Sequence, residues 1–85
     1  MPLTEDQWNE WAKGVLKAEI SRRNLTFVEV ADRLKEIGID ESGRNVSNKI
    51  GRGTFSATFM LQVLAAIGCT TLRIDPPEGM ADPQS

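Results

Sequence analysis

Residues 26–53 read TFVEVADRLKEIGIDESGRNVSNKIGRG and contain the signals of two short helices joined by a turn. Thr26 and Glu29 have the spacing of a capping box, in which each side chain satisfies the other residue's backbone N–H at the start of a helix. Apolar residues then recur at helical spacing and mark the buried side of that helix: Phe27, Val30, Ala31, Leu34 and Ile37. The pattern predicts a helix over residues 27–37.

The second helix of this stretch follows a glycine turn. Gly38 can take the left-handed conformation that closes a helix. The next residues supply cap oxygens and negative charge, which are favourable at a helix N-terminus: Asp40, Glu41 and Ser42. Val46 and Ile50 are four residues apart and point inward if this segment is helical. We therefore predict a short helix over residues 43–51.

Two more helices flank this pair. Thr4 and Gln7 form another capping box, which predicts a helix over residues 5–23. Its apolar stripe, which we expect to complete a small core, is formed by Trp8, Trp11, Ala12 and Val15. Thr54 or Ser56 caps a fourth helix, whose expected buried residues are Met60, Val63, Leu64 and Ile67. The predicted fold is all-α, a compact domain of four to five helices.

The segment after the fourth helix alternates in polarity. Residues 70–75 place threonine, leucine and isoleucine at every second position, which predicts a short C-terminal β-strand. The chain has no second strand pattern, so this strand would pair with the same segment of a second molecule, with Leu72 and Ile74 at the dimer interface. The alternative is an extended segment lying along its own helices. We expect one domain over residues 1–75 and a disordered acidic tail over residues 76–85.

Composition excludes several classes of function. The chain has 85 residues, enough for one modest core, and its N-terminal sequence and apolar runs match neither a signal peptide nor a membrane span. We expect a cytoplasmic protein. One cysteine and no histidine exclude an internal disulfide and a conventional zinc site. With no histidine, tyrosine or phosphate loop, an enzyme is not expected, nor is a cofactor, a metal or a small-molecule substrate.

Charge is segregated along the sequence. The chain has 10 lysines and arginines against 12 aspartates and glutamates, so it is acidic overall. No acidic residue lies between Ser42 and Ile74, whereas that interval contains the bases Arg44, Lys49, Arg52 and Arg73. This local excess of positive charge predicts a surface that binds a polyanion.

The helix over residues 43–51 gives that surface a direction. With Val46 and Ile50 inward, the opposite side presents Arg44, Asn48 and Gly51, flanked by other polar residues. Arginine pairs in bidentate fashion with guanine and asparagine with adenine, so these are the residue types of a major-groove reader. The alternative is an ordinary solvated polar helix, but such helices usually mix acids with bases.

The order of these elements resembles the lambda-repressor-like helix-turn-helix superfamily. Thr26, Ala31 and Gly38 stand where that superfamily has a cap residue, a packed alanine and a turn glycine. The arginine-glycine pair at residues 52–53 and the apolar-glycine step at residues 67–68 also match it. More narrowly, the chain resembles an uncharacterised bacterial and phage domain family, most distinctively in NKIGRGTFSA, residues 48–57. The spacing from Ala31 to the inward valine of the third helix is longer than is usual in the superfamily.

The resemblance implies a homodimeric, sequence-specific double-stranded DNA-binding protein, a small transcriptional regulator whose third helix enters the major groove. The residues then expected at base edges are Arg44, Asn45, Ser47 and Asn48. Those expected at phosphates are Thr26, Lys49, Arg52, Thr54 and Ser56. The alternative is a protein-interaction adaptor or antitoxin-like module that uses the first helix, with Trp8 and Trp11, or the C-terminal strand.

Overall fold

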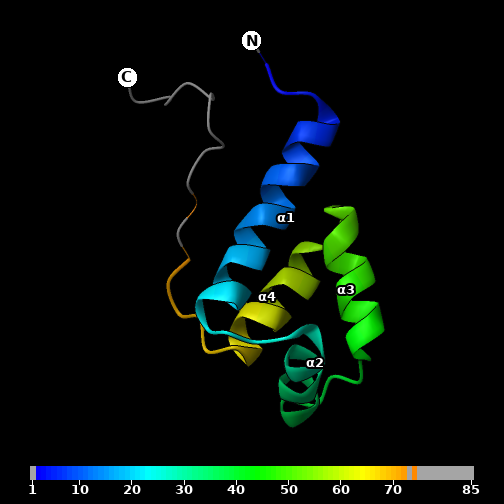
Figure 1. The fold of residues 1–85 in the computed structure, drawn as a ribbon, viewed down its shortest axis with the longest axis vertical. Coiled ribbons are helices and arrows are strands. Elements are labelled where there is room, and N and C mark those ends of the chain that lie inside the picture. Colours follow the sequence, from blue (N-terminus) through cyan, green and yellow to red (C-terminus); the bar gives the residue numbers. More distant parts are fainter. Residues whose placement is uncertain (1, 73, 75–85) are drawn as a thin grey trace.

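The computed structural model describes residues 2–72 and 74, and this part of the chain folds into four α-helices (Figure 1). The helices are α1 (Glu5–Arg22), α2 (Phe27–Glu36), α3 (Gly43–Arg52) and α4 (Ala57–Ala66). The expectation of an all-α fold is therefore confirmed for the described residues. The bounds of the first three helices differ from the predicted ones by a single residue, and in each case at the C-terminal end.

Both predicted capping boxes are present. The Thr4 hydroxyl accepts the N–H of Gln7 at 3.2 Å, and the Gln7 side-chain oxygen accepts the N–H of Thr4 at 2.9 Å. Thr26 and Glu29 repeat the arrangement at the start of α2, with distances of 3.1 and 2.9 Å. Each box satisfies two backbone donors that would otherwise lack a partner at the helix N-terminus.

Serine residues begin the other two helices. The Ser42 hydroxyl accepts the N–H of Asn45 at 3.1 Å, and the Ser56 hydroxyl accepts the N–H of Phe59 at 3.0 Å. Of the two candidates for the cap of α4, Ser56 is therefore the cap and Thr54 precedes it. All four helices thus start at a hydroxyl side chain.

The core lies where α2, α3, α4 and the second half of α1 meet. Val46 and Ile50 are 0% exposed, as the sequence predicted for the inward side of α3. The other buried apolar residues are Leu16, Ile20, Val30, Ala31, Leu34, Phe59, Val63, Leu64 and Ile67. Ile37 was expected among them but is 50% exposed, because α2 ends at Glu36, and Ile39, after the turn, packs against the core instead.

The N-terminal end of α1 extends past the other helices (Figure 1). Trp8 is 46% exposed and Trp11 is half-buried, and their rings stack with centroids 5.2 Å apart. The expectation that both rings complete the core is therefore wrong for Trp8. The buried side of α1 begins only at Leu16, because the three shorter helices cover only part of this 18-residue helix.

The ends of α2 and α4 are closed by the same turn. The N–H of Ile39 donates to the carbonyl of Leu34 at 2.9 Å, and the N–H of Cys69 donates to the carbonyl of Leu64 at 2.8 Å. The second turn brings the Cys69 thiol to 3.7 Å from the carboxylate of Glu19, which ties the end of α4 to α1.

The predicted strand over residues 70–75 includes Arg73 and Asp75, which lie outside the described residues, as does the tail at 76–85. Leu72 packs against the core and Ile74 is exposed. The strand, the dimer pairing through it and the disordered tail therefore stay predictions. Among the residues that the structure describes, no helix is both long enough and apolar enough to cross a membrane.

Candidate nucleic-acid interface

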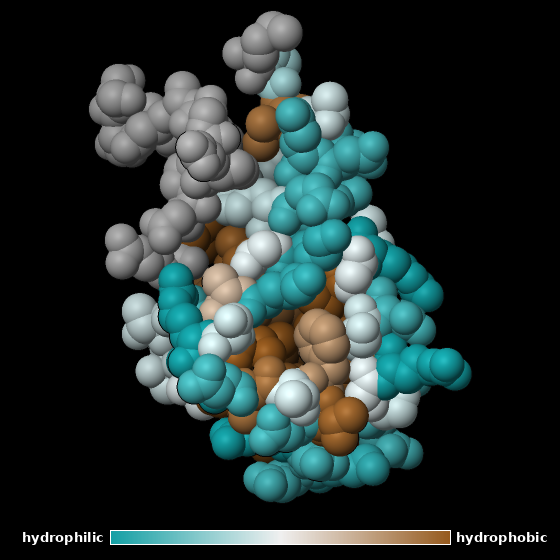
Figure 2. Space-filling model, in the orientation of Figure 1, coloured by the Kyte–Doolittle hydropathy of each residue, from teal (hydrophilic) through white to brown (hydrophobic). Residues whose placement is uncertain are grey.

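The outer side of α3 is a polar stripe. Arg44, Asn48 and Arg52 are all exposed and lie four residues apart, directly opposite the buried Val46 and Ile50. Successive members of the stripe are about 6 Å apart along the helix axis. Neither arginine forms an ion pair with any residue that the structure describes. Figure 2 shows hydrophilic residues along the edge of the molecule that α3 forms.

The other two residues expected at base edges lie beside this stripe. Asn45 is exposed. Its backbone N–H donates to the Ser42 cap, and no described hydrogen bond involves its side chain. Ser47 is half-buried, on the flank of the stripe opposite Asn45. The structure thus brings Arg44, Asn45 and Asn48 together on an open surface, with Ser47 at its margin.

The start of α3 packs tightly against the start of α2. A Cβ atom on Gly43 would lie 2.9 Å from the Val28 Cγ2 atom and 3.0 Å from the Val28 Cα atom, closer than side chains normally approach. Thr26, the cap of α2, is two residues before Val28. The first turn of α2 is therefore fixed next to the N-terminal end of the α3 stripe.

Lys49 is held against the protein. Its ammonium group pairs with the carboxylate of Glu41 and lies 5.1 Å from the centroid of the Phe59 ring in the first turn of α4. A cation over an aromatic face is attracted by the negative charge of that face. Lys49 was expected at phosphates, yet its charge is already compensated, so Arg44 and Arg52 are the cations that α3 presents outward.

The hydroxyl groups expected at phosphates begin helices. Thr26 and Ser56 are exposed, and each hydroxyl oxygen accepts a backbone N–H of its own helix. The hydroxyl hydrogen of each remains a donor that a phosphate oxygen could accept. Thr54 is exposed two residues before Ser56. Thr26 lies near the start of α3 through the contact of Val28 with Gly43, and the Phe59 contact places the first turn of α4 near Lys49.

The buried carboxylate of Glu19 forms ion pairs with two other arginines. Glu19 is almost fully buried and pairs with Arg22 and, at 3.0 Å, with Arg23. Arg23 also donates to the backbone carbonyl of Glu19 at 2.9 Å. The hydrogen bond from Arg23, aided by the charge of Arg22, lowers the pKa of Glu19 below its usual 4.5 although burial opposes this. These arginines therefore stabilise the end of α1.

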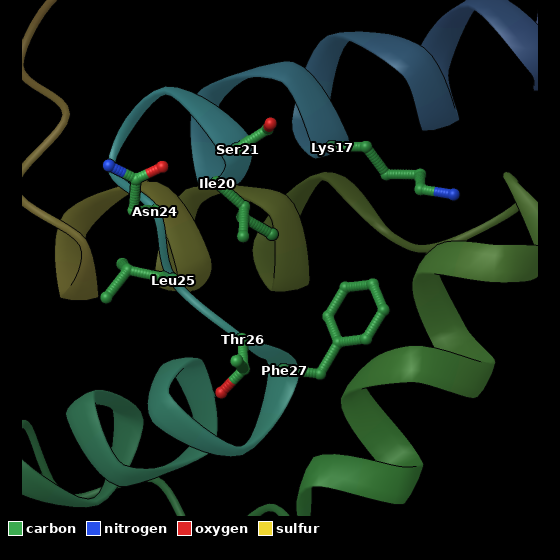
Figure 3. Close-up of a pocket in the computed structure, with 7 residues that line it drawn as sticks. All are labelled: Lys17, Ile20, Ser21, Asn24, Leu25, Thr26 and Phe27. Carbon is green, nitrogen blue, oxygen red and sulfur yellow. The ribbon is translucent and has the colours of Figure 1, made fainter.

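A shallow pocket lies at the junction of α1 and α2 (Figure 3). Its volume is about 360 Å³. Ile20, Leu25 and Phe27 supply apolar walls, and Lys17 and Asn24 lie at its rim. Figure 2 shows it as an apolar hollow bordered by hydrophilic residues.

Two carboxylates were missed as partners by reasoning from sequence. Glu41 was interpreted only as a helix cap, although it lies eight residues before Lys49 and joins the otherwise acid-free surface. Glu19 precedes Arg22 and Arg23 by three and four residues, a spacing that favours ion pairs on a helix and could have identified it.

Comparison with known proteins places this surface inside a recognised domain. A model of the family described as Domain of unknown function (DUF6471) matches residues 8–72, from Trp8 in α1 through α4 to Leu72. No curated protein and no solved structure matches the chain. The match includes the whole α3 stripe and the helices that support it.

Proposed function

The chain belongs to the DUF6471 family of domains of unknown function, and we propose that it is a sequence-specific double-stranded DNA-binding protein, a small transcriptional regulator that reads the major groove with α3. The observation that carries the proposal is the exposed stripe of Arg44, Asn48 and Arg52 on a helix whose other side is fully buried. A helix about 10–12 Å across fits a major groove about 12 Å wide.

Base reading falls to the first half of the stripe. Asn48 lies at its middle, where a carboxamide can donate to and accept from the edge of adenine. Arg44 lies one turn earlier and offers two parallel donors to guanine. Asn45 and Ser47 flank these two residues and contact neighbouring base pairs. Because Val46 and Ile50 are locked in the core, the stripe is presented with little freedom to rotate.

Groups near the two ends of α3 bind phosphates in this mode. Thr26 and Ser56 donate from hydroxyl groups at helix N-termini, where the backbone N–H groups and the helix dipole also favour an anion. Arg52 and Thr54 extend this contact past the end of α3. Lys49 joins it only when its pairing with Glu41 opens.

Few cations support this mode of binding, so affinity per molecule is modest. Each phosphate neutralised contributes about 0.9 to the slope of log affinity against log salt, and α3 presents two unpaired arginines within the described residues. A homodimer would double the contacts and bind two half-sites about one helical turn apart. Such a protein would regulate by occupying its operator and would need no cofactor.

The test is selection of bound duplexes from a random pool, followed by anisotropy titration of the selected site at several salt concentrations. The expected result is a short enriched motif bound at least about 10³-fold more tightly than unrelated DNA, with affinity that falls as salt rises. Equal binding to all sequences would rule out a specific regulator, and binding that ignores salt would rule out the phosphate contacts.

A second candidate function is protein interaction through α1. Trp8 is 46% exposed and stacks on Trp11, whose indole N–H is buried without an acceptor among the described residues. An exposed tryptophan at a projecting helix end is typical of an interface anchor. Trp8→Ala should then leave the fold and DNA binding intact while it abolishes capture of a specific partner. Retained capture would exclude this role for Trp8.

A further inference from the structure

The outer surface of α4 lacks charge. Residues 53–72 contain no lysine, arginine, aspartate or glutamate, and α4 lies in the middle of this stretch. The exposed residues of α1, α2 and α3, by contrast, include charged side chains in every helix. A surface helix of a small domain normally has a charged outer side.

The exposed apolar residues of α4 form one narrow stripe, and the exposed Thr58 lies beside it. Ala57, Leu61 and Ala65 are four residues apart and all exposed, and Gly68 continues the line just past the helix. Leu61 is 63% exposed, among the most exposed of the large apolar residues that the structure describes. The other side of the same helix is buried through Phe59, Val63 and Leu64. A helix with a buried inner side and an uncharged, largely apolar stripe on its outer side is suited to being covered by another structure.

We propose that this stripe is a homodimer interface in which the α4 helices of two molecules pack antiparallel about a two-fold axis at Leu61. In this arrangement Leu61 faces its own copy, and Ala57 of one molecule lies opposite Ala65 of the other. The alanines have short side chains, so the two helices can approach closely while the leucines fill the centre. The proposal does not rest on DNA binding.

Charge identifies a second copy as the occupant. In a two-fold interface a residue near the axis faces its own symmetry mate, so a charge there faces a like charge. Of the four helices, α4 is the one that contains no charged residue and can face itself without this repulsion. A nucleic acid or a charged peptide lying on the stripe would instead require complementary charges, which Ala57, Leu61 and Ala65 do not offer.

The measurement is sedimentation equilibrium of the full chain over about 1 µM to 1 mM, since a single-helix interface is smaller than the roughly 800 Å² per partner of typical stable complexes. The weight-average mass of the wild type should rise toward twice the monomer mass of 9.4 kDa. Leu61→Lys should remain monomeric at every concentration. Val28→Lys is the matched control, because Val28 is also 63% exposed but lies on α2, and it should dimerise like the wild type.

Cross-linking tests the geometry independently of affinity. Leu61→Cys in a Cys69→Ser background should form an intermolecular disulfide on mild oxidation, whereas Val28→Cys in the same background should not. Circular dichroism confirms that each variant is folded. A wild type that stays monomeric throughout overturns the proposal, and so does dimerisation of Leu61→Lys. Loss of the dimer in Ile74→Lys but not in Leu61→Lys would assign the interface to the C-terminal segment.

Discussion

The backbone carbonyl oxygen of Asn9 occupies the space that a Cβ atom on Gly53 would need. Gly53 also has a φ of 68°, in the left-handed region where side chains are strained. This buried glycine ends α3 and brings its C-terminus against the first half of α1. The orientation of the polar stripe on α3 therefore depends on the contact between Gly53 and Asn9, which only glycine permits because its Cα carries a hydrogen where all other amino acids carry a Cβ atom.

Gly53→Ala should destabilise the domain. The backbone strain alone costs about 1–2 kcal/mol, and the clash with Asn9 adds to it. The midpoint of thermal unfolding should fall by at least about 4–8 °C. Gly51→Ala is the control: its Cβ meets nothing within 4 Å and it lies inside α3, so it should stabilise the domain by up to about 1 kcal/mol. Equal effects of the two substitutions would contradict the packing of α3 on α1.

Glu41→Gln should release Lys49. Without the carboxylate, the ammonium group can move from the Phe59 ring to a phosphate, so DNA affinity should rise and the salt slope should steepen by about 0.9. Unfolding free energy should change by no more than about 1 kcal/mol, because the pair is partly exposed. Asp40→Asn removes the same charge one residue earlier, at an exposed side chain, and should leave the slope unchanged. The readout is an anisotropy titration at several salt concentrations.

Glu19→Gln should remove a pH-dependent part of the stability. The arginines lower the pKa of Glu19 in the folded state, so its contribution is present above the unfolded pKa, near 4.5, and is lost as pH falls through the lower folded value. At pH 7 the variant should be less stable by about 1–3 kcal/mol, since Arg23 loses a charged acceptor.

Urea unfolding at pH 7 and at pH 3 checks this prediction, and the difference between variant and wild type should shrink at the lower pH. Glu10→Gln serves as the comparison, because Glu10 pairs with Lys13 at an exposed site and should change stability by less than about 1 kcal/mol. A difference for Glu19→Gln that is the same at both pH values would show that the carboxylate titrates normally.

Asn48→Ala should relax base preference at one position of the selected DNA site by about 1–3 kcal/mol. Arg52→Ala should instead weaken binding to all sequences alike and reduce the salt slope by about 0.9. Both side chains are exposed, so neither change should alter thermal stability appreciably. Competition titrations with single-base variants of the site would distinguish the two outcomes, and a uniform loss for Asn48→Ala would remove it from base reading.

The features predicted correctly from the sequence are those that neighbouring residues determine. Thr26 and Glu29 form their capping box because a helix start brings residues three apart into contact, whatever the rest of the chain does. Val46 and Ile50 are buried because periodicity defines an inward side. The bounds of the first three helices were accurate to a residue for the same reason.

The features that sequence reasoning missed depend on what lies across the fold. Trp8 matches the apolar period of α1, but its burial requires a neighbour on its own side of the helix, and Trp8 is still 46% exposed. Lys49 lies within a basic stretch, yet the turn that places Glu41 beside it and the packing of Phe59 under it are tertiary. Periodicity gives the direction of a side chain and leaves open what that side chain meets.

The stacked rings of Trp8 and Trp11 also determine how the protein can be observed. The chain has two tryptophans and no tyrosine, so its near-ultraviolet emission comes almost entirely from the first half of α1. Far-ultraviolet circular dichroism, by contrast, reports on all four helices. If the projecting end of α1 frays before the core melts, the two signals will give different unfolding midpoints. The emission curve will then report the local opening of one helix end and will not report the unfolding of the whole domain.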